Sequence, residues 1–276
     1  MKKLTVIVVL FCIALMGFNA CARDDQCPRK TENFNSGWRF FQGDLPKASN
    51  MLFDDTGWRP LELPHDWAIE GDFSEEHPSG SGGGALPGGV GWYRKTFSLD
   101  KSHEGKKIFI DFDGVYMNSD VWINGIHLGH RPCGYISFRY DLTPHLQLDT
   151  ENVIAVRVDN SEQPNSRWYS GCGIYRNVWM TSVDPVYVDL WGVFVTTPEV
   201  TKERAQVNVK TTVKNEMSEK VNLRTETTVV DASGKQIALA SVDGSLEALS
   251  SNEYEQELTV TEPQLWSPDS PTRIIP

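Results

Sequence analysis

Polar and aromatic side chains collect in two segments of the chain that show no regular hydrophobic pattern. The first, 65–90, begins with His65-Asp66-Trp67 directly after a proline, and the second, 164–176, contains Ser166 and Arg167 among aromatic residues. End loops of β-sandwiches commonly carry binding groups, so these two segments are the candidate sites. Aromatic faces also bind sugars, and the nine tryptophans of the chain favour a carbohydrate ligand.

Each of these residues also has a purely structural interpretation. Asp66 could cap the amides of a turn, and Arg167 could form a surface ion pair of little energetic value. His65 could be a satisfied turn residue, with no metal partner near it in the sequence. Trp168 and Tyr169 are expected to pack against other side chains more often than to stack on a sugar.

Composition and spacing exclude several other functions. Lysine and arginine number 26 against 37 aspartate and glutamate, a net charge of −11 that argues against a nucleic-acid partner. The glycine-rich stretch 80–84 lacks the lysine and βα unit of a phosphate-binding loop. Cys27, Cys133 and Cys172 show no metal-ligand spacing, so no metal or cofactor is expected. Cys133 and Cys172 could form a bridge, but our default interpretation is that all three cysteines are small buried residues.

The stretch 108–129 predicts the sheet on which these loops depend. Ile108, Ile110 and Phe112 alternate with Phe109, Asp111 and Asp113, the period of a half-buried strand with the second set on its solvent side. Further along, Asn124-Gly125 separates two apolar runs and predicts a hairpin with a type I′ turn. The hairpin should place Ile123 opposite Ile126, and Val121 opposite Leu128.

The pattern of residue types along the chain changes around residues 183–185. Segments 187–197, 205–215, 221–231 and 254–261 alternate polar and apolar residues, with many Thr, Val and Glu. The sequence therefore predicts an all-β protein with a jelly-roll (galactose-binding-like) sandwich at 33–184 and an immunoglobulin-like β-sandwich at 186–276. An immunoglobulin-like sandwich has about seven strands, so the second one is expected to be incomplete at its C-terminus.

The N-terminus is typical of a secretion signal. Lys2-Lys3 precede an apolar run over 4–18, which is short for a membrane span, and we expect residues 1–22 to be a signal peptide. Cleavage could follow Ala22, or Cys21 could be the lipidated first residue of a lipoprotein. Either alternative exports the chain to the periplasm or outer membrane of a Gram-negative bacterium. Contact with a membrane is expected only through the lipid anchor.

A set of short motifs carries a resemblance to glycoside hydrolase family 2, in particular to its β-galactosidases of Bacteroides type. The motifs are LPHDW at 63–67, GWYR at 91–94, FDGV at 112–115, VWING at 121–125, RWYSG at 167–171, GIYRNV at 173–178 and LWSPD at 265–269. The resemblance covers residues 33–271. It implies a sugar-binding jelly roll followed by an immunoglobulin-like domain.

The resemblance also implies roles for individual residues. Asp66 falls on the family's polar position that contacts the bound sugar, and Ser166 or Arg167 falls on a second position near that sugar. The implied ligand is a β-galactoside-type carbohydrate. The family's two catalytic carboxylates belong to a (β/α)8 barrel that follows these domains, so we expect no catalytic residue in this sequence and little activity from it alone.

Three functional hypotheses follow. The chain could be the N-terminal part of a β-galactosidase-type hydrolase from a truncated, split or frame-shifted gene, with a barrel domain possible in trans. It could instead be a stand-alone carbohydrate-binding lipoprotein, for which the aromatic loops argue. A purely structural spacer is a third alternative, which suits residues 186–276 better than residues 33–184.

Overall fold

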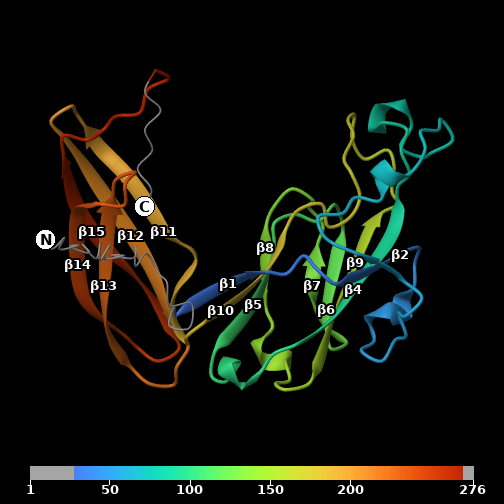
Figure 1. Ribbon diagram of the computed structural model, residues 1–276, viewed down its shortest axis with the longest axis horizontal. Coiled ribbons are helices and arrows are strands. Elements are labelled where there is room, and N and C mark those ends of the chain that lie inside the picture. The colour runs from blue at the N-terminus through green and yellow to red at the C-terminus, as the bar shows by residue number, and fades with distance from the viewer. Residues whose placement is uncertain (1–27, 270–276) are drawn as a thin grey trace, which may run out of the picture.

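The computed structural model describes residues 28–269, which form two β-lobes joined through consecutive strands β10 and β11 (Figure 1). The first lobe contains β1 (Arg29–Asn33), β2 (Trp38–Gln42), β3 (Arg59–Leu61), β4 (Gly89–Ser98), β5 (Lys107–Phe112), β6 (Ser119–Ile123), β7 (Ile126–Arg131), β8 (Phe138–Asp141), β9 (Glu151–Asn160) and β10 (Val178–Val183). The second contains β11 (Val186–Val200), β12 (Arg204–Asn215), β13 (Val221–Val230), β14 (Gln236–Leu246) and β15 (Ser250–Thr261). The predicted all-β class is confirmed.

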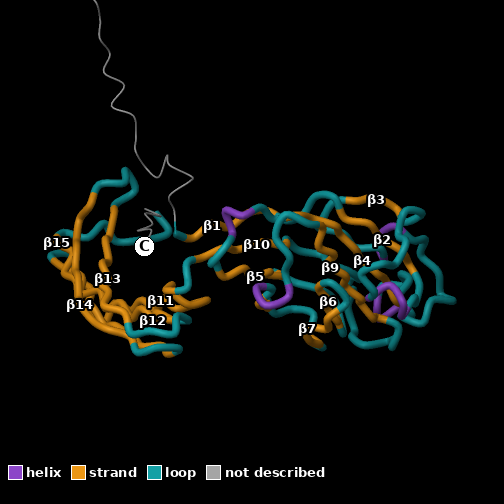
Figure 2. The backbone as a smooth tube through the Cα atoms, turned by 90° about the horizontal axis from the view of Figure 1, so that it is seen from below, coloured by secondary structure: helices purple, strands orange, loops and turns teal. Residues whose placement is uncertain are grey.

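Two antiparallel sheets face each other in the first lobe. One has the strand order β3-β2-β4-β9-β6-β7 and the other the order β1-β10-β5-β8. Their inner faces bury a single large core that includes Trp38, Tyr93, Ile110, Phe112 and Ile154. The turned view of Figure 2 shows the lobes end to end, with β1 and β10 on the side of the first lobe that faces the second.

The predicted turn at the central hairpin is confirmed. Asn124 and Gly125 have φ angles of +51° and +83°, the left-handed conformation that a type I′ turn requires at both central positions. Ile123 pairs with Ile126 across the turn, as expected. Asparagine and glycine are the residues that adopt this conformation most readily, which explains why so short a motif predicts the hairpin correctly.

The second predicted pair of this hairpin is wrong. Val121 pairs with Gly129 instead of Leu128, because a β-bulge shifts the register between Val121 and Trp122. Trp122 still faces His127, so Leu128 is the extra residue on β7. A bulge of this kind bends and twists the strand that contains it. Turn residues determine the register next to the turn, but they do not indicate a bulge two residues further along the strand.

The second lobe consists of the sheets β11-β12-β15 and β13-β14. Among residues 28–269 it therefore has five strands, fewer than the number expected of an immunoglobulin-like sandwich. The sequence pattern does not predict strand β14, because Asp243-Gly244-Ser245 within it is typical of a turn. Gly244 is required there by packing, because a Cβ atom at this position would lie 2.3 Å from the Tyr254 ring.

Side chains at the base of β5 and β11 join the two lobes. Tyr187 packs against Phe109 and Val183, and its hydroxyl donates a 2.6 Å hydrogen bond to Glu216. Lys107 lies 2.6 Å from the same Glu216 carboxylate. Phe109 was expected on the solvent side of its strand, but the second lobe covers it. Strand β5 is therefore buried on both faces at this end.

The helical content of the described residues is limited to short 3-10 turns. They lie at Pro46–Ser49, Ala68–Glu70, Ser81–Gly83, Lys101–His103 and Thr143–His145. The last of these lies just after β8. Within residues 28–269, no helix has the length and apolar character needed to cross a membrane.

Candidate functional site

The two candidate loops lie against each other at one end of the first lobe. The His65 amide donates to the Ile174 carbonyl at 2.8 Å, and the Trp67 amide donates to the Cys172 carbonyl at 3.1 Å. These two bonds pair the start of the first loop with the end of the second in an antiparallel manner. Each of these bonds joins residues more than 100 positions apart in the sequence. The two segments thus form one surface, which we call the end-loop cluster (residues 65–70 and 165–174).

Asp66 is the residue that ties this cluster together. Its Oδ1 accepts hydrogen bonds from the Ala68 amide at 3.0 Å and the Cys172 amide at 2.8 Å, and its Oδ2 accepts one from the Tyr169 hydroxyl. A carboxylate has about four acceptor positions, so one remains for a ligand hydroxyl. The capping role considered for Asp66 is therefore present in the structure, and it leaves room for the sugar contact that the resemblance implies.

Glycines permit this close approach of the two loops. Gly171 has φ +61°, and a Cβ atom there would lie 2.7 Å from Asp66 Oδ2. Gly173 has φ +122°, and its Cβ would lie 2.7 Å from the His65 carbonyl oxygen of the first loop and 2.3 Å from the Tyr93 hydroxyl. Both positions combine a left-handed backbone with contact to the opposite loop, so any other residue would push the loops apart.

Behind Asp66, a polar network that runs from the buried His65 and Tyr93 to the exposed Arg59 and Glu70 holds His65 in place. Nδ1 of His65 lies 2.7 Å from the Tyr93 hydroxyl, and Nε2 lies 2.6 Å from an Arg59 amino group, which also binds the Glu70 carboxylate. Burial lowers the pKa of His65, and this effect outweighs Glu70, which acts to raise it. Neutral His65 accepts from Arg59 and donates to Tyr93, so it supports the loop and faces away from solvent.

Ser166 and Arg167 lie on the outer part of the second loop. The Ser166 hydroxyl donates to the Trp168 carbonyl at 2.6 Å. Arg167 is exposed and has no ion-pair partner among the described residues, so the predicted surface ion pair does not form. The structure records no direct contact between either residue and Asp66. Asp66 reaches this loop through Tyr169 and Cys172 instead.

The two aromatic residues of the loop behave differently from expectation. Trp168 is 62% exposed, with its Nε1 donating to the Tyr135 hydroxyl at 3.2 Å, so its ring is available for stacking. Tyr169 uses its hydroxyl to bind Asp66. Burial, followed by this hydrogen bond, raises the pKa of Tyr169. Nothing in the spacing of the sequence indicates the Tyr169–Asp66 contact, since it joins residues 103 positions apart.

The two cysteines within residues 28–269, Cys133 and Cys172, are not paired with each other. Cys133 is exposed and Cys172 is buried, and both are free thiols. The possible bridge between them is therefore absent, and the expectation of burial holds for Cys172 alone. Burial raises the pKa of Cys172 to about 12, which keeps it protonated and unreactive. Cys21 and Cys27 lie outside the described residues.

The cluster presents a surface and does not enclose a ligand. Its walls surround a cavity of about 10 Å³ between Leu86, Asn160 and Tyr169, which is too small for a sugar ring. What it can offer a ligand is the remaining acceptor position of Asp66, the Arg167 guanidinium and the Trp168 indole. Such a set suits the rim of a binding site whose remaining walls come from elsewhere.

Comparison with known proteins identifies the class. Residues 86–184 match the family model "Glycosyl hydrolases family 2, sugar binding domain", and residues 186–273 match "Glycosyl hydrolases family 2". The chain therefore belongs to glycosyl hydrolases family 2, which confirms the resemblance seen in its motifs. The first match lies within the first lobe, and the second begins at β11, the first strand of the second lobe.

Individual members of this family are also similar to the chain. "Beta-galactosidase BoGH2A" of Bacteroides ovatus is 57% identical over 88% of this chain and 29% of its own length, and the chain matches its N-terminal part. A "Beta-glucuronidase" of Formosa agariphila is 32% identical over 86% of this chain and 26% of its own length. The crystal structure of a family 2 member from Bacteroides cellulosilyticus has a TM-score of 0.85 at 36% identity, covering 88% of this chain and 32% of that one. The chain thus spans less than a third of the length of these relatives.

Proposed function

We propose that this chain supplies the sugar-binding and immunoglobulin-like part of a family 2 enzyme that hydrolyses β-galactosides, with the end-loop cluster at the rim of its catalytic centre. The 57% identity to a β-galactosidase carries this proposal. In this role Asp66 accepts a sugar hydroxyl at its remaining acceptor position, and Arg167 and Trp168 flank the sugar. Hydrolysis itself requires a pair of carboxyl groups on either side of the glycosidic bond, and we assign no such pair to the two sandwiches.

The proposal is tested first at the level of the gene. The coding DNA should be sequenced past the codon for Pro276, where a reading frame for a (β/α)8 barrel is expected, continuous with this one or separate from it. The purified chain is expected to show no turnover of an aryl β-galactoside by itself, and to support turnover when that barrel is supplied. Turnover by the chain alone, or unrelated DNA downstream, would contradict the proposal.

The substrate class is tested in the same assay. Relatives named as β-glucuronidases also match the chain, so an aryl β-glucuronide is the comparison substrate. With the barrel present, Asp66→Asn is expected to raise KM for the galactoside several-fold, because the uncharged amide is a weaker acceptor of the sugar hydroxyl. A preference for the glucuronide would reassign the substrate while leaving the family intact.

A second candidate function is a free-standing carbohydrate-binding lipoprotein, favoured by the exposed Trp168 ring and the unpaired Arg167. Calorimetric titration of the chain with galactosides decides it, since a flat titration would exclude this alternative. For both functions we propose export through residues 1–22 with Cys21 as the lipid attachment site. Cys21→Ser should abolish labelling by a fatty-acid analogue, and retained labelling would refute lipidation there.

A further inference from the structure

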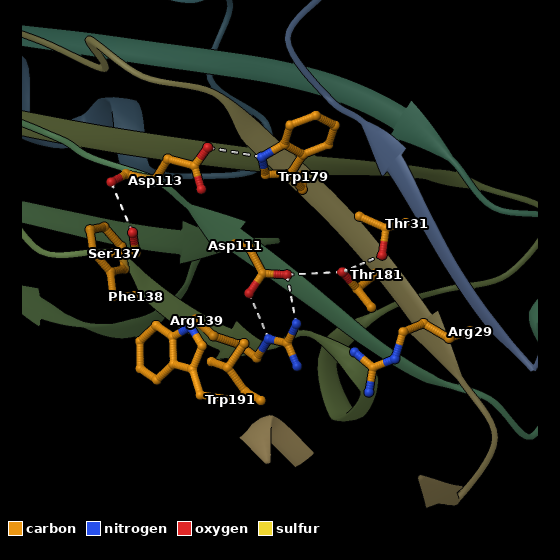
Figure 3. A pocket seen from close by; sticks show the side chains of 11 residues that line it. Arg29, Thr31, Asp111, Asp113, Ser137, Phe138, Arg139, Trp179, Thr181 and Trp191 are labelled. Carbon is orange, nitrogen blue, oxygen red and sulfur yellow. Dashed lines mark hydrogen bonds and ion pairs between the residues drawn. The ribbon is translucent and has the colours of Figure 1, made fainter. Parts of the chain in front are cut away.

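A second cavity, unrelated to the end-loop cluster, lies at the junction of the two lobes. It has a volume of about 310 Å³ and is lined by the outer face of the sheet β1-β10-β5-β8 and by Leu190 and Trp191 of β11 (Figure 3). This volume is at the lower end of the range for small-molecule sites, about 300–1,000 Å³. None of the lining residues belongs to the end-loop cluster, so a ligand here would bind independently of Asp66.

The floor of this cavity, which we call the junction cleft, is a fixed array of polar groups. Arg139 binds Asp111 through two nitrogens at 2.6 and 2.8 Å, and the Thr181 hydroxyl donates to the same carboxylate at 2.9 Å. Beside them, Nε1 of Trp179 donates to Oδ2 of Asp113 at 3.0 Å. Figure 3 shows these side chains side by side on neighbouring strands. Their mutual bonds orient them in advance of any ligand.

The wall of the junction cleft comes from an irregularity in β11. Residues 189–192 form an insertion in this strand, because Val188 pairs with Val213 and Val193 already pairs with Thr211. Trp191 at the tip of the insertion has φ +53° and is 75% exposed. A positive φ is a strained conformation that is rare for a bulky residue, and such positions cluster at functional sites.

A glycine makes this insertion possible. A Cβ atom at Gly192 would lie 2.8 Å from the Thr212 carbonyl and 2.9 Å from the Asp189 carbonyl. Asp189 is in turn held by Lys214 at 3.0 Å. The strand thus maintains a strained conformation whose visible result is an exposed indole placed beside a polar cleft. Bulges that re-aim a side chain are frequent next to binding sites.

Among the residues that line the junction cleft, Arg29 is the cation without a carboxylate partner. Its guanidinium donates to the Val188 carbonyl, and no carboxylate among the described residues lies within ion-pair distance of it. Of the two carboxylates that line the cleft, Asp111 is already bound by Arg139, and Asp113 accepts a hydrogen bond from the Trp179 indole. Burial, followed by the positive charge of Arg139, lowers the pKa of Arg29, as expected of a half-buried cation that lacks a full counter-charge.

We propose that the junction cleft binds an acidic saccharide, with one pyranose face on the Trp191 indole and the sugar's carboxylate or sulfate on Arg29. A guanidinium binds either anion through two parallel hydrogen bonds. An indole next to it covers the apolar face of the ring. The remaining oxygen of Asp113 and the hydroxyl of Thr31 lie along the cleft, where they can bond to sugar hydroxyls.

Isothermal titration of the purified chain tests this site with three probes of equal length: tetragalacturonate, a sulfated galactotetraose and neutral galactotetraose. At least one acidic probe is expected to bind at least ten-fold more tightly than the neutral one. Its affinity should fall as NaCl is raised from 50 to 500 mM, because the contact is ionic. Which acidic probe binds better distinguishes carboxylate from sulfate recognition.

Variants locate the binding. Trp191→Ala and Arg29→Gln are each expected to weaken binding of the acidic probe at least five-fold. Trp266→Ala is the matched control, because Trp266 is 62% exposed and lies outside the cleft lining, and it should leave this binding unchanged. Trp168→Ala shows separately whether the probe binds at the end-loop cluster. Trp191→Gly is the second variant, because glycine retains the positive φ and preserves the strand if alanine disturbs it. Equal binding of the neutral probe, no binding of any acidic probe, or loss of binding in Trp168→Ala alone would overturn the proposal.

Discussion

Replacing Asp66 with alanine should loosen the end-loop cluster by an amount that its contacts determine. Alanine removes the acceptor of the Ala68 and Cys172 amides, and both of those residues are only 2% exposed. A buried donor left without a partner costs about 1–3 kcal/mol, so the two amides together give about 2–6 kcal/mol. Asp66 itself is partly exposed and water can reach one side of it, so we expect the lower half of that range.

Urea denaturation followed by tryptophan fluorescence measures this loss. The buried tryptophans of the first lobe, such as Trp38, Trp67 and Trp92, report on the unfolding of that lobe. Glu75→Ala is the matched control, because Glu75 is an exposed carboxylate of the same loop. Asp66→Asn retains one acceptor oxygen and should fall between the two. If Asp66→Ala unfolds at the same urea concentration as Glu75→Ala, Asp66 does not tie the loops together.

Three further predictions concern other parts of the molecule. Burial lowers the pKa of Lys95 to about 8, against about 10.5 in the unfolded chain. Between these pH values the unfolded chain binds more protons than the folded one, so the free energy of unfolding should rise from pH 8 to 10.5. Lys95→Met should lack that rise when melting is measured against pH, and an equal slope in both proteins would refute the prediction. Thiol labelling with peptide mapping should modify Cys133 quickly and Cys172 only on unfolding, whereas rapid labelling of Cys172 would contradict its burial. Val193 and Val195 line an apolar groove of about 700 Å³ in the second lobe. The chain should therefore bind a hydrophobic dye and self-associate, and Val193→Thr should reduce both dye binding and self-association. A monodisperse protein that binds no dye would count against this prediction.

Local chemistry accounts for what the sequence predicted well. The Asn124-Gly125 turn follows from the backbone conformations that only such residues adopt readily, and the alternation over 108–112 follows from the geometry of a pleated strand. Both depend on neighbours along the chain. The family motifs add the order of the two sandwiches and point to Asp66, which proves to lie at the centre of the end-loop cluster.

Contacts between distant segments decided the rest. The β7 bulge, the strand β14 and the burial of Phe109 all depend on what packs against a residue from elsewhere in the chain. The bond from Tyr169 to Asp66 and the junction cleft around Trp191 are of the same kind. The sequence by itself determined most of the segments that become strands and turns, β14 excepted, because those are local preferences. Only the tertiary structure decided which side chains meet, because the free energy of such a contact depends on partners that no spacing in the sequence reveals.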